Sequence, residues 1–275
     1  MVDQPVRRTV AGLTCAEWGP GDGPPVLALH GLTSTSQAWS ALAAALPATR
    51  VVAPDLPGRG GSAAAHAGTG LAGHATAVVA LADELRLENV TLVGHSMGAF
   101  LAPLVARALG DRVRRIVLVD GGVHPDPSPL LRRPVVRAMF AVQGAMLTRR
   151  WPGPDAFVDR IEGRALRNRP ELRPMVREWA AYLLDEAGRA RLDRRRLLAD
   201  ATDTLTGEPT LGAVRDLAAP VHLLAASRGA HDEAAAFLSD AALARAAALV
   251  PRLTWERVTA NHLTLLADPA LAAAC

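Results

Sequence analysis

The sequence predicts an α/β fold: a doubly wound, mostly parallel sheet with a helical insertion. Short apolar runs recur along the chain, and Val, Ile and Leu follow one another almost without interruption in most of them. Such runs are typical of strands that are covered on both faces, as in a parallel sheet. Segments rich in Ala and Leu with helical spacing alternate with these runs, which is the signature of a doubly wound sheet.

The elements follow from these two patterns. The expected strands are VLAL at 26–29, RVVAPD at 50–55, VTLVG at 90–94, RIVLVD at 115–120, VHLLAA at 221–226 and LTWERV at 253–258. The expected helices of the core are 36–46, 73–86, 97–109 and 234–249. Residues 6–19 are interpreted as an antiparallel hairpin with Gly12 near its turn.

The alternation stops between residues 122 and 212. That segment is rich in Arg, has helical patterning at 130–149, 155–168, 171–184 and 189–204, and is divided by prolines. We therefore expect a core of residues 1–121 and 213–275 and a helical insertion of residues 122–212.

Composition excludes several classes of protein. With 50% hydrophobic residues among 275, the chain can bury a large core, so a disordered protein is excluded. The net charge is only +3 and aromatic residues make up 4%, which argues against nucleic-acid binding. Cys15 and Cys275 have no CxxC spacing, so neither a disulfide framework nor a metal site is expected. No signal peptide or membrane span is evident, and we expect a cytoplasmic monomer or homodimer without a cofactor.

One short stretch, LVGHSMGA at residues 92–99, indicates chemistry. It fits G-x-S-x-G, with an expected strand before it and an expected helix after it. A sharp turn between strand and helix strains its tip residue and crowds the positions two residues away, which favours glycine at both. Ser96 would therefore lie exposed at the carboxyl end of the sheet, where open α/β sheets bind ligands.

A serine nucleophile needs a base and a carboxylate that orients the base. In this arrangement the order along the chain is Ser, Asp or Glu, then His. His262 follows the last expected strand, so we expect it to be the base. Asp232 follows the strand at 221–226 and is our choice for the acid, with Asp120 and the adjacent Glu233 as alternatives.

Two backbone N–H groups are expected to bind the oxyanion that forms during acyl transfer. One belongs to Met97, directly after the serine. The other belongs to Leu32, because His30-Gly31 turns the chain after the first parallel strand and leaves that N–H free.

These motifs together resemble the α/β-hydrolase superfamily. HGLTSTSQAW, PDLPGRGGS at 54–62, LVGHSMGA, RIVLVDGG and the late Asn-His at 261–262 come in its order and spacing, over nearly the whole chain. The resemblance implies that residues 122–212 form a helical cap or lid. The turn SRGAHDE is about two residues longer than the acid turn usual in the family, yet its similarity to R-G-x-x-D-E turns favours Asp232.

The resemblance also narrows the reaction. Epoxide hydrolases and haloalkane dehalogenases of this superfamily use Asp where this chain has Ser96. We expect a serine hydrolase that cleaves a carboxylic ester or related acyl substrate through an acyl-enzyme. The alternatives are a C–C bond hydrolase or thioesterase with the same triad, or a non-catalytic ligand-binding protein on this fold. Residues expected to line the substrate pocket are Trp39, Phe100, Met139, Met146, Trp151, Phe157, Trp179 and Tyr182.

Overall fold

The computed structural model describes the chain except for residues 1–3, 21–22, 66–67, 69, 127 and 209. Within the described residues, eight strands form one sheet in the order β1-β2-β4-β3-β5-β6-β7-β8. Strands β1 and β2 pair antiparallel, as do β2 and β4, and the remaining neighbours are parallel. The mostly parallel sheet predicted from the sequence is confirmed. The strands are β1 (Val6–Val10), β2 (Leu13–Trp18), β3 (Val26–Leu29), β4 (Val51–Pro54), β5 (Val90–His95), β6 (Val113–Val119), β7 (Val221–Ala226) and β8 (Leu253–Val258).

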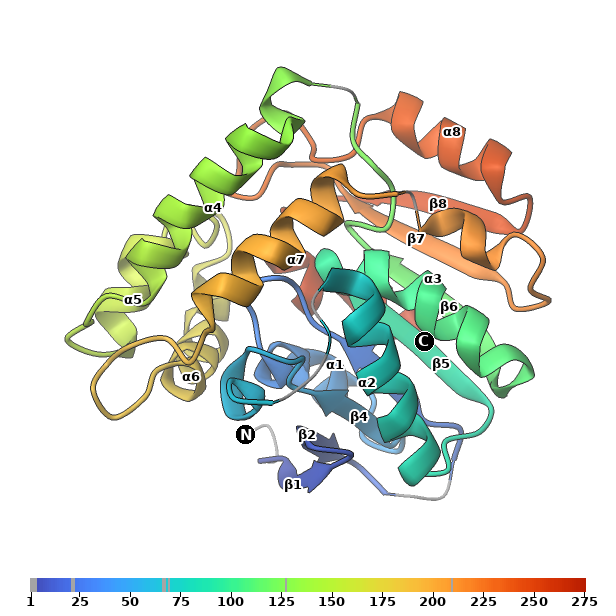
Figure 1. Ribbon diagram of the computed structural model, residues 1–275, viewed down its shortest axis with the longest axis horizontal. Coiled ribbons are helices and arrows are strands. Elements are labelled where there is room, and N and C mark those ends of the chain that lie inside the picture. The colour runs from blue at the N-terminus through green and yellow to red at the C-terminus, as the bar shows by residue number, and fades with distance from the viewer. Residues whose placement is uncertain (1–3, 21–22, 66–67, 69, 127, 209) are drawn as a thin grey trace.

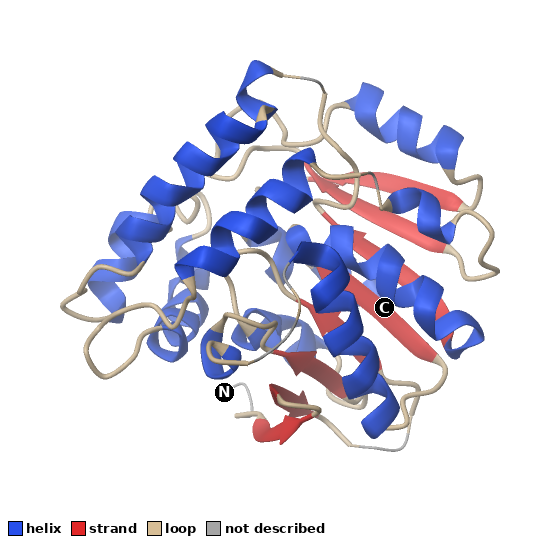
Figure 2. Cartoon of the chain, in the orientation of Figure 1, coloured by secondary structure: helices blue, strands red, loops and turns tan. Residues whose placement is uncertain are grey.

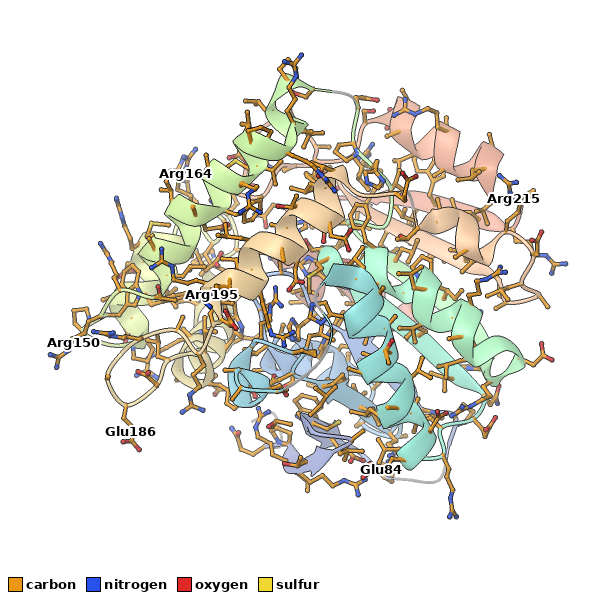
Figure 3. The ribbon with its side chains drawn as sticks, viewed as in Figure 1. Glu84, Arg150, Arg164, Glu186, Arg195 and Arg215 are labelled. Atoms are coloured by element: carbon orange, nitrogen blue, oxygen red, sulfur yellow. The ribbon has the colours of Figure 1, made fainter. Side chains whose placement is uncertain are left out.

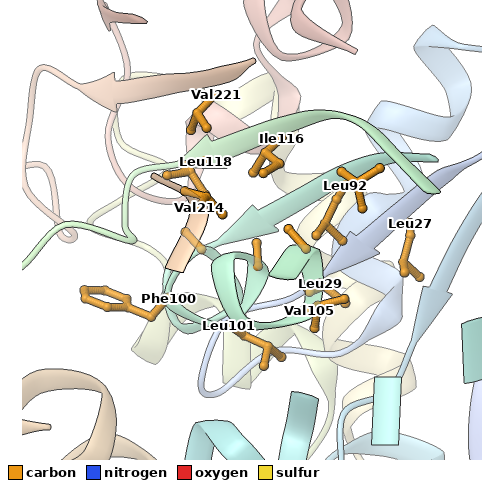
Figure 4. Close-up of a cluster of buried hydrophobic side chains, with 14 of the residues drawn as sticks. Leu27, Leu29, Leu92, Phe100, Leu101, Val105, Ile116, Leu118, Val214 and Val221 are labelled. Carbon is orange, nitrogen blue, oxygen red and sulfur yellow. The ribbon is translucent and has the colours of Figure 1, made fainter. Parts of the chain in front are cut away.

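Helices cover both faces of the sheet, as Figures 1 and 2 show. Side chains of α2 (Gly70–Glu84), α3 (Met97–Leu109) and α8 (Asp240–Leu249) share one apolar cluster with the strands. Side chains of α1 (Ser40–Ala45) and α9 (Pro269–Ala274) belong to the cluster on the other face. Figure 4 shows part of the first cluster, where Phe100 and Leu101 of α3 lie beneath Leu118 of β6. The near-continuous apolar runs of the central strands β3, β4 and β5 thus have their physical reason, because every residue of these strands is buried and neither face of them meets water.

Two expectations about helix positions are corrected. Helix α8 begins at Asp240 rather than at residue 234, because the Ser239 side chain accepts a hydrogen bond from Ala242 N–H at 3.1 Å and caps the helix there. Helix α9 was not expected, since its six residues are too few for a periodic pattern. Asp268 caps it by accepting from Ala270 N–H at 3.0 Å.

The chain between β6 and β7 is helical. It contains α4 (Arg133–Leu147), α5 (Pro154–Ile161), α6 (Arg173–Leu183) and α7 (Arg194–Thr206). We refer to residues 122–212 as the helical insertion. Its buried side chains, among them Phe157 and Trp179, form an apolar cluster of their own. In Figure 1, α7 lies between α4 and the rest of the molecule. None of the helices within the described ranges is long and apolar enough to cross a membrane.

The loop after β4 joins the insertion to the core through several hydrogen bonds. Asp55 on this loop accepts from the N–H groups of Ser36 (2.7 Å) and Gly61 (2.8 Å) and from the hydroxyl of Tyr182 (2.5 Å). Two backbone hydrogen bonds of 2.9 Å, Gly60 N–H to the Arg191 carbonyl and Asp193 N–H to the Gly58 carbonyl, join the same loop to the insertion. The PDLPGRGGS motif therefore positions the insertion.

A buried ionic network lies beside that loop. Arg59, which is fully buried, forms an ion pair with Asp200 of α7. Nε2 of the buried His74 lies 2.9 Å from the same carboxylate, and Gly70 N–H donates to it at 3.0 Å. The Arg59 Nε–H also donates to the Leu32 carbonyl at 3.0 Å. One carboxylate of the insertion thus neutralises a buried guanidinium that touches the loop after β3.

We predict that Asp200→Asn destabilises the fold by about 3–5 kcal/mol, because it leaves the Arg59 charge buried without a counter-ion. Urea unfolding measures the loss. The matched control is Asp155→Asn, which removes a carboxylate from an exposed ion pair with Arg177 and should leave the free energy of unfolding close to that of wild type. Equal losses in the two variants would contradict the role given to Asp200.

Candidate active site

Ser96 lies at a strained turn between β5 and α3. Its φ of 53° and ψ of −118° are uncommon for a residue with a side chain. A Cβ on Gly94 would lie 2.2 Å from the Gly98 carbonyl oxygen, and a Cβ on Gly98 would lie 2.0 Å from the Leu29 carbonyl oxygen. Only glycine fits at both positions, which explains the G-x-S-x-G spacing. Within residues 90–103, all of which are described, Ser96 is the one residue that is not buried.

His262 is held against Asp120. The Nδ1 of His262 lies 2.6 Å from Oδ2 of Asp120, and the carboxylate is fully buried. The other carboxylate oxygen accepts from the N–H of Ala226, at the end of β7, at 3.1 Å. Asp120 therefore accepts the Nδ1 proton and fixes the plane of the imidazole ring, which leaves Nε2 as the free nitrogen. Neither this Nε2 nor the Ser96 hydroxyl has a hydrogen-bond partner among the described residues.

The expectation that Asp232 lies against His262 is wrong, and the alternative Asp120 takes this place. Asp232 instead accepts from Arg228 Nε–H (2.7 Å) and from the side-chain amides of Asn168 (2.5 Å) and Asn261 (3.4 Å). Glu233, the third candidate, accepts from His231 N–H at 2.8 Å and is exposed. The longer turn after β7 thus gives both carboxylates partners other than the histidine ring.

A sequence signal for Asp120 existed in the two glycines that follow it. A Cβ on Gly121 would lie 2.6 Å from the Ser96 carbonyl oxygen, and a Cβ on Gly122 would lie 2.8 Å from the Ala99 carbonyl oxygen. The end of β6 therefore approaches the serine turn so closely that only glycine fits. The Asp-Gly-Gly of RIVLVDGG marks this approach.

His95 supports the backbone of His262. The two imidazole rings lie 4.4 Å apart between centroids, and Nε2 of His95 is 3.0 Å from the His262 carbonyl oxygen. Burial, with a smaller contribution from His262, lowers the pKa of His95 well below its ordinary value, so this ring is neutral at physiological pH. The residue before the serine thus holds the histidine loop next to the serine turn.

Leu32 N–H and Met97 N–H are both without an acceptor among the described residues. Met97 is the first residue of α3, where no intrahelical acceptor exists for its N–H. The peptide of Gly31 and Leu32 is fixed through its carbonyl oxygen, which lies 2.8 Å from His30 Nδ1 and accepts from Ser34 N–H at 3.2 Å. Because the peptide is planar and trans, fixing the Gly31 carbonyl also fixes the direction of the Leu32 N–H.

His30 is a neutral donor in this arrangement. Burial lowers its pKa to about 4. Its Nε2 accepts from Leu56 N–H at 2.9 Å, so its Nδ1 carries the proton that is donated to Gly31. The histidine of the HG turn therefore links the loop after β3 to the loop after β4.

Comparison with known proteins identifies the family. The model of the alpha/beta hydrolase family matches residues 26–274, which is most of the chain. The chain belongs to the alpha/beta hydrolase family. The chain is 37% identical over 132 residues to the lipase LipV of Mycobacterium tuberculosis, across 48% of the chain and 49% of LipV. It spans less than half the length of the curated relatives that it matches first.

Solved structures share the fold of the chain over nearly its whole length. E-2-(acetamidomethylene)succinate hydrolase is similar with a TM-score of 0.75 and 23% identity, over 97% of this chain and 96% of that one. A thioesterase domain from the curacin biosynthetic pathway is similar with a TM-score of 0.70 and 22% identity, over 98% and 97%. At these identities the likeness concerns the fold alone.

Sequence patterns did not indicate Glu162, a carboxyl group that the insertion brings near the histidine. Burial raises its pKa to about 7, and the charge of His262 offsets part of that effect. The residue follows α5, and Ala165 in the next turn accepts a hydrogen bond of 2.7 Å from the side-chain amide of Asn261. This hydrogen bond holds the segment of Glu162 against the loop of His262.

Most of the aromatic residues expected to line a pocket have packing roles instead. Trp39 and Phe100 lie in the two clusters of the core, and Trp151, Phe157 and Trp179 lie in the cluster of the insertion. The Tyr182 hydroxyl is bonded to Asp55, and Met146 packs at the edge of the insertion's cluster. Met139 is 50% exposed on the outer side of α4. Helical spacing of apolar residues marked buried faces rather than a pocket.

We predict that Ser96→Gly stabilises the fold by about 1 kcal/mol. Glycine relieves the backbone strain at this turn, and the gain exceeds the extra conformational entropy of glycine in the unfolded chain. Ser96→Ala, which keeps the Cβ, serves as the control and should leave the free energy of unfolding within about 0.5 kcal/mol of wild type. A glycine variant no more stable than the alanine variant would show that the turn is not strained.

We predict that Glu162 makes stability depend on pH between about pH 4.5 and 7. Its pKa is raised from 4.5 to about 7 in the folded chain, so the folded state binds the proton more tightly. The stabilisation is complete below pH 4.5 and is lost as the pH rises through 7. Glu162→Gln should therefore gain stability relative to wild type as the pH rises, measured by urea unfolding. Glu178→Gln, at an exposed position of α6, is the matched control for the loss of one carboxylate. If the free energy of unfolding of Glu162→Gln differs from that of wild type by the same amount at every pH, the prediction is wrong.

Proposed function

We propose that this hydrolase cleaves carboxylic esters or related acyl compounds, with Ser96 as nucleophile, His262 as general base and Asp120 as the acid that orients it. The observation that carries the proposal is the buried Asp120 carboxylate on His262 Nδ1, next to a serine that is held at a strained and partly exposed turn. The lipase LipV, to which half of the chain is similar, supports acyl chemistry.

The reaction follows from the directions of the donors and acceptors. His262 Nε2 takes the Ser96 proton while the Ser96 oxygen attacks the acyl carbon. The charge that develops on the acyl oxygen is stabilised by the N–H groups of Leu32 and Met97, aided by the N-terminus of α3. The imidazolium gives its proton to the leaving alcohol, and the acyl-enzyme forms. Water then attacks in the same way and releases the acid, so ester and water become acid and alcohol.

The helical insertion acts as a cap in this proposal. It is joined to the histidine loop through Asn261 and to the loop after β4 through Asp200 and Tyr182. It thereby encloses the acyl substrate, and its inner surface determines which acyl groups fit.

The first experiment incubates wild type and Ser96→Ala with p-nitrophenyl esters of increasing acyl length and with a fluorophosphonate probe. Wild type should hydrolyse at least one ester and should be labelled at Ser96, whereas Ser96→Ala should do neither. Labelling without hydrolysis of any oxygen ester would favour a thioester or C–C substrate, since the same serine chemistry applies. The absence of both activities would favour a ligand-binding protein.

We predict that Asp120→Asn lowers kcat by about 10⁴-fold, because an amide at this place favours the wrong tautomer of the histidine. Asp232→Asn should lower kcat by less than about tenfold, because Asp232 acts only through Arg228, Asn168 and Asn261. Initial rates on the best p-nitrophenyl ester measure both. The assignment of the acid fails if the two losses are reversed.

A further inference from the structure

One side of α4 is apolar and uncovered. Five apolar residues lie on the same side of the helix, because they occupy positions i, i+3, i+4, i+7 and i+10: Val135, Ala138, Met139, Val142 and Ala145. All five are exposed, and the exposed fractions of Val135, Met139 and Val142 are 37%, 50% and 71%. We call these five residues the α4 stripe. A row of exposed apolar residues of this length marks an interaction surface.

The helix cannot rotate to bury this stripe. Its other side packs on α7, and Val136 and Gly144 are buried there, while Leu147 is buried in the cluster of the insertion. A Cβ on Gly144 would lie 2.9 Å from the Leu197 side chain of α7, so the two helices approach closely at that point. The α4 stripe therefore lies on the exposed side of a helix that itself runs along the outer edge of the molecule in Figure 1.

The charged residues of the segment that carries the stripe have one sign. Residues 127–154 contain five arginines (Arg132, Arg133, Arg137, Arg149 and Arg150) and neither Asp nor Glu. All five are exposed, and none forms an ion pair with a carboxylate in the part of the chain that the structure describes. Figure 3 shows Arg150 projecting outward beyond the end of α4. An apolar stripe with arginines at both ends of its helix is the pattern of a helix that lies in the plane of a lipid interface.

We propose that the α4 stripe binds this hydrolase to an anionic lipid surface, with the apolar side chains in the outer layer and the arginines on the lipid phosphates. The charges favour this partner over a second copy of the chain. Symmetric pairing of two α4 helices would bring arginines near arginines, and residues 127–154 hold no carboxylate to neutralise them. The proposal goes beyond the hydrolytic function and does not depend on the chemistry of Ser96.

The test is co-sedimentation of the whole chain with two kinds of vesicle, phosphatidylcholine alone and equal parts of phosphatidylcholine and phosphatidylglycerol. The chain should bind the second kind, and high salt should weaken the binding because the arginine charges are screened. Arg137→Gln should weaken the binding about fivefold.

Val142→Glu should weaken the binding at least about tenfold, because it removes an apolar contact and adds a repulsive charge. The matched control is Val6→Glu, which makes the same change at a position that is 69% exposed on β1. That control should bind as wild type does. Val142→Glu should also keep the thermal unfolding midpoint and the labelling of Ser96 by a fluorophosphonate probe, which shows that the change is local.

Three results would overturn the proposal. The first is equal binding of wild type to both kinds of vesicle, or to neither. The second is equal binding of Val142→Glu and Val6→Glu. The third is self-association in light scattering that Val142→Glu abolishes, without binding to vesicles, which would assign the stripe to a second copy of the chain. Vesicle binding and light scattering are measured without a substrate, so each of these results can be interpreted whether or not the chain hydrolyses esters.

Discussion

The hydrogen bond between His262 Nδ1 and Asp120 is the interaction on which the site depends. Its carboxylate is fully buried, so its position is set by its surroundings: the N–H of Ala226 holds one oxygen, and Gly121 lets the end of β6 approach the serine turn. His95 holds the backbone of His262 from the serine side. Three neighbouring strands of the parallel sheet, β5, β6 and β7, thus converge on one imidazole ring at their carboxyl ends.

A second group of contacts joins the insertion to the core and to the loop that carries Leu32. Arg59 contacts the Leu32 carbonyl on one side and Asp200 of α7 on the other. A shift of α7 would therefore disturb the loop whose N–H is proposed to stabilise the oxyanion. The position of α7 and the geometry of the loop that carries Leu32 are therefore coupled. If Arg59 kept its contact with Leu32 but lost Asp200, its charge would stay buried without a counter-ion, which is strongly destabilising.

Local patterns predicted the strands and the serine turn because each leaves a short signature in consecutive residues. The apolar run at 221–226 and the glycines at 94 and 98 can be recognised without knowing which other segments they approach. The carboxylate that contacts His262 could not be chosen from a local pattern. Asp120 and Asp232 both follow a strand, and only the path of the turn after β7, fixed by contacts with Arg228 and Asn168, decides which one meets His262. Glu162 was missed because its place near the histidine depends on how the insertion folds back.

The most direct test of the site is the proton NMR signal of His262 Nδ1–H. A strong hydrogen bond to a buried carboxylate moves such a proton far downfield, beyond the amide region. The signal should be present in wild type and in Asp232→Asn, and it should be absent or shifted upfield in Asp120→Asn and His262→Ala. A signal that survives in Asp120→Asn but disappears in Asp232→Asn would contradict the geometry from which the function has been inferred.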